Sequence, residues 1–225
     1  MTAPIQTDAP FDLSQTDKLL TTTRSVRKRL DFSRPVDSGV VRDCLDIALQ
    51  APSGGNSQPW RWLVVDDPHV KSQLAVLYKK AHDPYMDGNR QAAEQAGTLE
   101  KMASIMDSSQ YLADHIGEAP FLVIPCLLSR LPADGPNFDV AGFYGSILPA
   151  AWSFMLALRS RGLGSAWTTL HLQYEREAAG ILGLPFETVT QTAMIPVAYY
   201  TGEDFKPARR QSVEKVMYRN AWGQR

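Results

Sequence analysis

One stretch, residues 51–62, constrains the fold of this chain more than any other. It reads Ala-Pro-Ser-Gly-Gly-Asn-Ser-Gln-Pro-Trp-Arg-Trp, so glycines that permit unusual backbone geometry stand among hydroxyl and amide side chains. An amphipathic helical pattern capped by Asp37 leads into the stretch and ends at Pro52, whereas the tryptophans begin a β-like run over residues 60–65. We therefore predict a helix-to-strand loop that can hold a flat polar ligand.

The rest of the chain alternates too few strands with helices for a doubly wound sheet, which favours an α+β fold. Further helices are predicted from residue 66 onward, over 140–161 with a kink at Pro149, and over 174–182; further strands are predicted over 121–128 and 190–200. The polar region 81–110 is predicted to be an amphipathic helix or a lid. Its adaptable apolar residues can cover a site, although a core or interface position is favoured for each: Tyr85, Met86, Met102, Ile105 and Met106.

The length of 225 residues fits one large domain with a core of its own. Residues 1–12 are polar and contain Pro4 and Pro10, so we predict a flexible arm ahead of a single domain over 13–225. Basic and acidic residues nearly balance, at 23 against 24, and the basic clusters are short, which argues against nucleic-acid binding. No apolar run approaches the ~20 residues that span a bilayer and no signal peptide is evident, so we expect no membrane partner and a cytoplasmic location.

The reactive side chains do not form a recognisable catalytic or metal-binding motif. Cys44 and Cys126 lie in apolar segments without a Cys-x-x-Cys pair, so we predict that both are core residues and that no metal is bound. No Gly-x-Ser-x-Gly motif is present, and His171 is the one histidine that stands beside a glycine-bearing loop. A hydrogen-bonded structural role is favoured for His171 over proton transfer. We therefore expect a cofactor to supply the chemistry.

Three further motifs carry polar groups suited to an anionic cofactor. Arg24-Ser25-Val26-Arg27 is either a solvated basic face or a phosphate cradle, because arginine forks and a serine hydroxyl match phosphate oxygens. The second glycine-bearing loop is predicted over 162–171 and begins Gly-Leu-Gly-Ser. It follows a helix and lacks a third glycine, so a dinucleotide-binding fingerprint is rejected. Arg209 and Arg210 stand near the C-terminus.

The order and spacing of these motifs, with the loop at 52–60 between them, closely resemble the nitroreductase family of FMN-dependent oxidoreductases. The resemblance covers roughly residues 19–222. It implies a three-layer α+β sandwich in which helices flank a mainly antiparallel mixed sheet. It also implies an obligate homodimer with FMN at the interface and exchange of C-terminal segments, which residues 217–222 would provide here.

The resemblance further implies roles for individual residues. Arg24 and Ser25 would meet the FMN phosphate together with Arg209 or Arg210, and Arg27 would reach the ribityl chain or the N1/O2 edge, where a cation stabilises the reduced flavin. The loop would come from the other subunit and line the ring and ribityl chain through Pro52, Ser53, Gly54 and Asn56, with Gln58 at or behind the ring edge. The residues expected over one flavin face and beside N5 are Thr168, Thr169 and Leu170.

The implied activity is a ping-pong oxidoreductase in which Thr168, Thr169 and Arg27 are the catalytic residues. NADH or NADPH would deliver hydride to flavin N5, and an electron-poor acceptor such as a nitroaromatic or quinone would then occupy the same place. The Thr168-Thr169 pair is uncommon in the family and resembles its dehalogenating branch. The alternatives are therefore a flavin-dependent dehydrogenase or reductive dehalogenase with a narrow substrate, and a non-catalytic FMN-binding or storage protein.

Overall fold

The computed structural model describes residues 10–131 and 134–225, so most of the predicted arm over 1–12 lies outside the described residues. Contacts divide the chain into two units. The larger unit spans Arg24–Gly202, and the smaller consists of the segments before Arg24 and after Gly202. Each unit is described by itself below.

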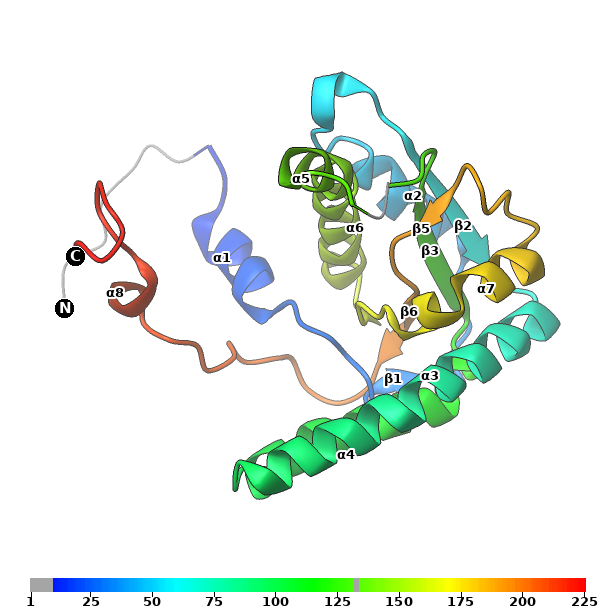
Figure 1. Ribbon diagram of the computed structural model, residues 1–225, viewed down its shortest axis with the longest axis horizontal. Helices are drawn as coiled ribbons and strands as arrows, with labels where there is room; N and C mark the ends of the chain where they lie inside the picture. Colours follow the sequence, from blue (N-terminus) through cyan, green and yellow to red (C-terminus); the bar gives the residue numbers. More distant parts are fainter. Residues whose placement is uncertain (1–9, 132–133) are drawn as a thin grey trace. The chain divides into compact units, whose positions relative to one another are not determined.

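Within the described residues, six strands of the larger unit form one sheet with the order β1-β6-β3-β2, to which β4 adds beside β6 and β5 beside β3 (Figure 1). All the strand pairs are antiparallel. This arrangement confirms the predicted α+β class and its mainly antiparallel sheet. The strands are β1 (Leu30–Asp31), β2 (Trp60–Val65), β3 (Phe121–Leu127), β4 (Leu163–Ser165), β5 (Thr190–Gln191) and β6 (Ile195–Tyr200).

Helices cover both faces of the sheet. In Figure 1 the strands lie between α2 and α6 on one side and α3 and α7 on the other. The side chains of Val41 and Cys44 from α2 and of Phe154 and Leu158 from α6 are buried against strand residues such as Val123. The helices are α2 (Ser38–Ala48), α3 (Pro68–Gln95), α4 (Leu99–His115), α5 (Asn137–Gly145), α6 (Leu148–Ser160) and α7 (Glu175–Leu182), with short 3₁₀ helices η1 (Gly54–Asn56), η2 (Ile116–Glu118) and η3 (Leu170–Tyr174).

The helix predicted over 140–161 with a kink at Pro149 is two separate helices, α5 and α6. Proline has no N–H and its ring clashes with the carbonyl four residues earlier, so Pro149 is accommodated in the first turn of a new helix. The hydroxyl of Ser146, at the break, donates to the carbonyl of Gly142 at 2.8 Å. By length and composition, the segment Asn137–Ser160 is also apolar enough to cross a membrane, although the sequence analysis expected no apolar run of that length. The apolar residues of α6, including Phe154 and Leu158, are buried in the core.

The region 81–110 is helical, as one of the two alternatives predicted. Asp67 caps α3 by accepting from the N–H groups of His69 and Val70, Pro68 occupies the first turn, and the helix continues through Pro84 to Gln95. A short turn containing Gly97, at φ 62°, reverses the chain into α4. The two helices form the hairpin seen along the lower edge of Figure 1.

The predicted strand over 190–200 is interrupted between β5 and β6. The N–H and hydroxyl of Thr192 both donate to the carbonyl of Pro125, at 2.9 and 2.8 Å, and Met194 pairs with Thr168 instead of continuing along β3. Both β5 and β6 pair with β3, and Met194 within the interruption pairs with Thr168, which places Thr168 beside the sheet.

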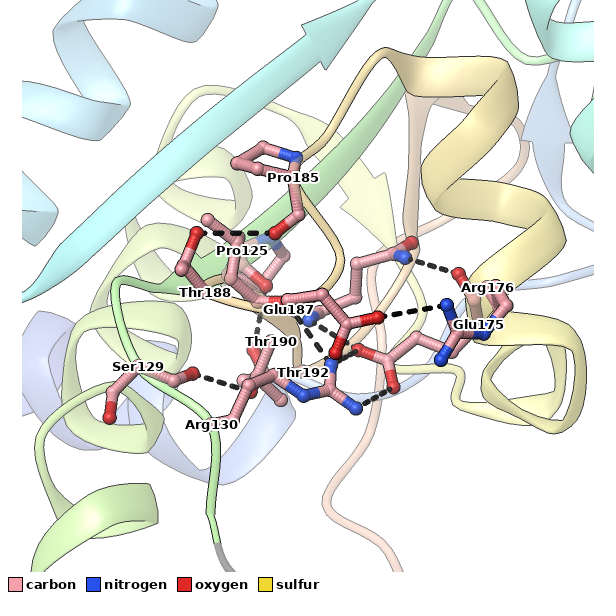
Figure 2. A network of polar contacts seen from close by, with 12 residues as sticks. Pro125, Ser129, Arg130, Glu175, Arg176, Pro185, Glu187, Thr188, Thr190 and Thr192 are labelled. Atoms are coloured by element: carbon pink, nitrogen blue, oxygen red, sulfur yellow. Dashed lines mark hydrogen bonds and ion pairs between the residues drawn. The ribbon is translucent and has the colours of Figure 1, made fainter.

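A polar network fixes this interruption to α7 (Figure 2). Arg130 makes a bidentate ion pair with Glu175, at 2.7 and 3.0 Å, and also donates to the carbonyl of Val189. Glu175 in turn accepts from the backbone N–H of Gln191 at 2.9 Å. Because Glu175 directly follows η3, the network holds the C-terminal end of the segment that contains Thr168 and Leu170. α7 ends at Gly183, which adopts the left-handed conformation at φ 66°.

The smaller unit contains α1 (Leu13–Thr22) and α8 (Val213–Val216). An ion pair between Lys18 and Asp204, at 2.9 Å, joins its two segments. Met217 and Trp222 are largely exposed, at 57% and 90%. The exchange of this segment between subunits remains a prediction.

Candidate functional site

The second glycine motif is a strand rather than the predicted loop, because β4 pairs with β6 from Leu163↔Tyr199 to Ser165↔Val197. The segment that contains the first arginine motif lies along its other side. Val26 donates its N–H to the carbonyl of Ser165 at 2.8 Å, and Ser25 forms a parallel bridge with Ser165. Glycine is required for this approach, since a Cβ on Gly164 would meet Val26 Cβ at 3.1 Å and Leu30 Cδ2 at 3.0 Å.

This close approach places Arg27 at a pocket of about 340 Å³. Thr168, Thr169 and Leu170 line the same pocket, so the structure brings together four of the predicted cofactor-binding residues. The α3–α4 hairpin supplies much of the remaining wall. Its lining residues are Tyr78, Tyr85, Met86, Asn89, Met102, Ile105, Met106 and Ser109.

Arg27 is the single charged residue on the described wall of this pocket. Its side chain is half-buried and makes no hydrogen bond or ion pair with any residue that the structure describes. The phenol of Tyr78 lies nearby, where burial raises its pKa to about 12, although the charge of Arg27 and a hydrogen bond with Thr168 partly oppose that rise. The pocket therefore offers an anionic ligand one unpaired guanidinium group beside a neutral phenol.

The two threonines have different hydrogen-bonding partners. The hydroxyl of Thr168 is buried and donates to the carbonyl of Met194. The backbone N–H of Met194 in turn donates to the carbonyl of Thr168 at 2.8 Å. The hydroxyl of Thr169 is exposed at the pocket and has no partner among the described residues. A hydroxyl has one proton to donate, so Thr169 rather than Thr168 has a hydroxyl free to donate to a ligand.

His171 follows these residues but does not have the hydrogen-bonded role predicted for it. Its ring is fully buried, and neither ring nitrogen has a hydrogen-bond partner among the described residues. Burial lowers the pKa of His171 to about 4, so the ring is neutral at physiological pH. His171 lies outside the lining of the pocket and is a core residue of η3.

The loop at 52–58 has the unusual backbone that its glycines predict. Asn56 and Gln58, which are not glycines, adopt positive φ angles of 53° and 47°. The hydroxyl of Ser53 accepts from the N–H of Gln58 at 3.0 Å, and the amide of Gln58 donates to the Asn56 carboxamide oxygen at 3.1 Å. Gly54 is held against the α5–α6 junction, where its N–H donates to the hydroxyl of Ser146 at 3.1 Å.

Within one chain this loop does not join the Arg27 pocket. Gly54 lines a second, shallow pocket of about 380 Å³ with residues of α5 and the segment after β3, and the two pockets share no lining residue. Pro52, Gly54, Asn56 and Gln58 are exposed and Ser53 is half-buried. The loop is thus held by its own hydrogen bonds and is accessible, but it lies away from the Arg27 pocket on the larger unit.

The predicted phosphate ligands are exposed. Arg24 and Ser25 stand at the bridge with Ser165, in the larger unit. Arg209 and Arg210 are exposed in the smaller unit, where Arg210 donates to the carbonyl of Arg209 at 3.1 Å. Their joining on one phosphate remains a prediction.

The sequence predicted the α3–α4 wall only as an alternative. The apolar residues of the region 81–110 were expected in the core or an interface, with cover of a site as the other possibility, and all five of them line this pocket. Tyr78, Asn89 and Ser109 are further lining residues that the sequence did not reveal. Tyr78, Tyr85 and Asn89 are seven and four residues apart, which places them on one face of α3, and this spacing was the available signal.

Comparisons with known proteins agree with this arrangement. The model of the Nitroreductase family matches residues 20–199. A protein of Thermus thermophilus named NADH dehydrogenase is 31% identical over 201 residues, which cover 86% of this chain and 90% of the relative.

Two solved structures share the fold at lower identity. An oxidised iodotyrosine deiodinase bound to FMN and 3-iodo-L-tyrosine superimposes with a TM-score of 0.69 at 23% identity, covering 90% of this chain and 97% of that one. The FMN-dependent nitroreductase NfnB of Mycobacterium smegmatis, in complex with NADPH, gives a TM-score of 0.67 at 18% identity, covering 93% of this chain and all of that one.

Proposed function

This chain belongs to the nitroreductase family of flavin oxidoreductases, and on that premise we propose that it uses FMN to pass hydride from NADH or NADPH to an electron-poor aromatic acceptor. The observation that carries the proposal is the Arg27 pocket, in which an unpaired guanidinium group and an unpaired hydroxyl of Thr169 face one cavity. A nitroaromatic or a quinone is the acceptor class that we propose.

The described residues fit FMN. The guanidinium of Arg27 is half-buried and has no partner among the described residues, so it can pair with the N1/O2 edge of a flavin. Thr169 can donate its hydroxyl at the other edge, while Thr168 holds the backbone in place through Met194. When bound, FMN supplies the two-electron carrier that the side chains of this pocket lack.

The protein's own residues then have binding and orienting roles. Arg24 and Ser25 would bind the phosphate beside β4, and Arg27 would favour negative charge on the reduced ring through its fixed position. Leu170 and the hairpin methionines would exclude water from the face where donor and acceptor bind in turn. No acid or base residue is needed for hydride transfer between two stacked rings.

We further propose a homodimer, because one chain does not assemble the whole set of predicted ligands. α5 carries Phe138 and Phe143, yet none of its residues is buried in the described chain, and Phe138 is 85% exposed. Leu148 and Trp152 on α6 are each 43% exposed. An exposed apolar helix next to the Gly54 loop supports a partner that covers α5 and receives this loop.

A reductive dehalogenase is the second candidate, and the free hydroxyl of Thr169 is the observation that favours it. The structural similarity to iodotyrosine deiodinase supports the same alternative at the level of the fold. This candidate would use the same cofactor site with a halogenated aromatic substrate.

The proposal is tested with purified, FMN-loaded protein under anaerobic conditions. We expect bleaching of the flavin absorbance by NADH or NADPH, and its recovery on addition of nitrofurazone. Failure of both nicotinamides to reduce the flavin would refute the proposed donor half-reaction. If the flavin stays oxidised under excess NADPH but dithionite reduces it, the storage alternative is favoured.

A further inference from the structure

The acceptor side of the Arg27 pocket has an uncharged wall. Four of its hairpin residues are apolar, namely Met86, Met102, Ile105 and Met106. The other members that face this side are polar but neutral: Tyr85, Asn89 and Ser109. Among the described residues that line the pocket, Arg27 carries the one charged group, and no carboxylate or ammonium group is present.

Three charged groups of the hairpin line a neighbouring pocket instead. Asp107 forms an ion pair with Lys28 and lines a neighbouring pocket together with Arg90 and Glu94. Met86 and Met106, which are 5% and 8% exposed, line both pockets and stand between the two sets of residues. Met86 and Met106 therefore separate the charged groups of Arg90, Glu94 and Asp107 from the Arg27 pocket.

The neutral polar groups suit an oxygen-bearing aromatic ligand. Neither the hydroxyl of Tyr85 nor the amide of Asn89 makes a hydrogen bond with any described residue, so both can donate to a nitro, carbonyl or quinone oxygen. The hydroxyl of Ser109 already pairs with the ring of His82 at 3.1 Å.

From this wall we propose that the acceptor site selects uncharged aromatic molecules and rejects those that carry an ammonium group, a carboxylate or both. The inference rests on the proposed function, in which Arg27 serves the cofactor and is not available to the acceptor. A charge that enters the pocket then loses water without gaining a partner, whereas a neutral oxygen finds Tyr85 and Asn89. A zwitterionic amino acid is the substrate class that this wall accommodates least.

Binding of three matched probes to the oxidised holoenzyme tests the inference without turnover. The probes are 4-nitrobenzyl alcohol, 4-nitrobenzylammonium and 4-nitrobenzoate, and dissociation constants are read from the change in flavin absorbance at pH 7.5. We expect the alcohol to bind at least about tenfold more tightly than either ion. Equal or tighter binding of either ion overturns the inference.

A designed carboxylate provides the second test. Asn89→Asp should tighten binding of 4-nitrobenzylammonium by about tenfold and leave the alcohol within about twofold, because it places a partner for the ammonium on the pocket wall. Gln91→Asp is the matched control: it adds the same charge on α3 at an exposed residue outside the pocket and should change neither constant. Equal effects of the two variants would contradict the assignment of the wall.

The outcome is separable from that of the proposed function. If neither nicotinamide reduces the flavin but the binding order holds, the donor half of the proposed function fails and the selectivity of the pocket stands. If reduction proceeds and all three probes bind alike, the selectivity fails and the oxidoreductase activity stands.

Discussion

Gly164 and Val26 are in such close contact that a Cβ on Gly164 would lie 3.1 Å from the Cβ of Val26. Such a distance is shorter than ordinary van der Waals contact, so the absence of a side chain at residue 164 sets the distance between β4 and the arginine motif. Two segments that are far apart in the sequence thereby become adjacent sides of one pocket.

Gly164→Ala should destabilise the protein by about 1–3 kcal/mol, because Val26 and Leu30 are both buried and must move to admit a methyl group. Chemical denaturation measures this loss, and FMN affinity should fall with it because Arg27 moves as well. Gly180→Ala is the control: it adds a methyl group on α7 with no atom within 4 Å, and should be neutral or stabilising by up to ~1 kcal/mol. Equal destabilisation by the two variants would contradict the close-contact argument.

The double variant Arg24→Ala with Arg210→Ala should lose FMN during purification. Each lost pair with phosphate costs about 1.5–3 kcal/mol of binding free energy if partly desolvated. The ratio of flavin to protein absorbance measures the loss. Arg42→Ala removes an exposed charge from α2 and should keep a full complement of cofactor. Stoichiometric yellow cofactor in the double variant would refute the phosphate assignment.

Thr168→Val and Thr169→Val should have different effects. Loss of the Thr168 hydroxyl leaves the Met194 carbonyl without its donor and should lower the free energy of unfolding by about 1–2 kcal/mol. Loss of the Thr169 hydroxyl should leave stability unchanged and shift the flavin reduction potential by ~20 mV, the equivalent of about 1 kcal/mol for two electrons. If the potential changes only in Thr168→Val, the assignment of the free hydroxyl is wrong.

Acid should destabilise the protein through His171. Burial lowers its folded-state pKa to about 4, whereas an exposed histidine titrates near 6.5, so between these values the unfolded state binds the additional proton. Stability is therefore present above pH ~6.5 and falls as pH drops toward 4, by at most ~1.4 kcal/mol per pH unit. His171→Leu should remove this component of the pH dependence measured by urea denaturation. His69→Gln, at an exposed residue of α3, should retain it.

Phe138→Glu should weaken self-association, since it places a charge on the apolar face of α5. Analytical ultracentrifugation measures the oligomeric state, and flavin content should fall together with the dimer fraction. Val76→Glu alters a single exposed valine of α3 and should leave both quantities unchanged. A monomer that binds FMN tightly would contradict a site shared between subunits.

Much of the local structure was predictable because it depends on neighbouring residues. Asp37 and Asp67 cap their helices, Gly183 ends α7, and β2 has its predicted bounds, since capping, left-handed turns and β-like patterning are short-range effects. Two predictions were wrong. Pro149 begins a helix instead of kinking one, because its ring is accommodated in a first turn. The strand predicted over 190–200 is interrupted, and within the interruption Met194 pairs with Thr168 from a distant segment.

By itself, the sequence determined the α+β class, the motifs that belong to a flavin site and the family that they resemble, because these follow from residue types and their order. Only the tertiary structure decided which motifs meet within one chain. It joined Arg27 to Thr169 through the contact between Gly164 and Val26 and kept Gly54 at a separate pocket. It also turned the neutral face of α3 and α4 toward that site. Long-range packing and strand pairing set these distances, and residue order alone does not specify them.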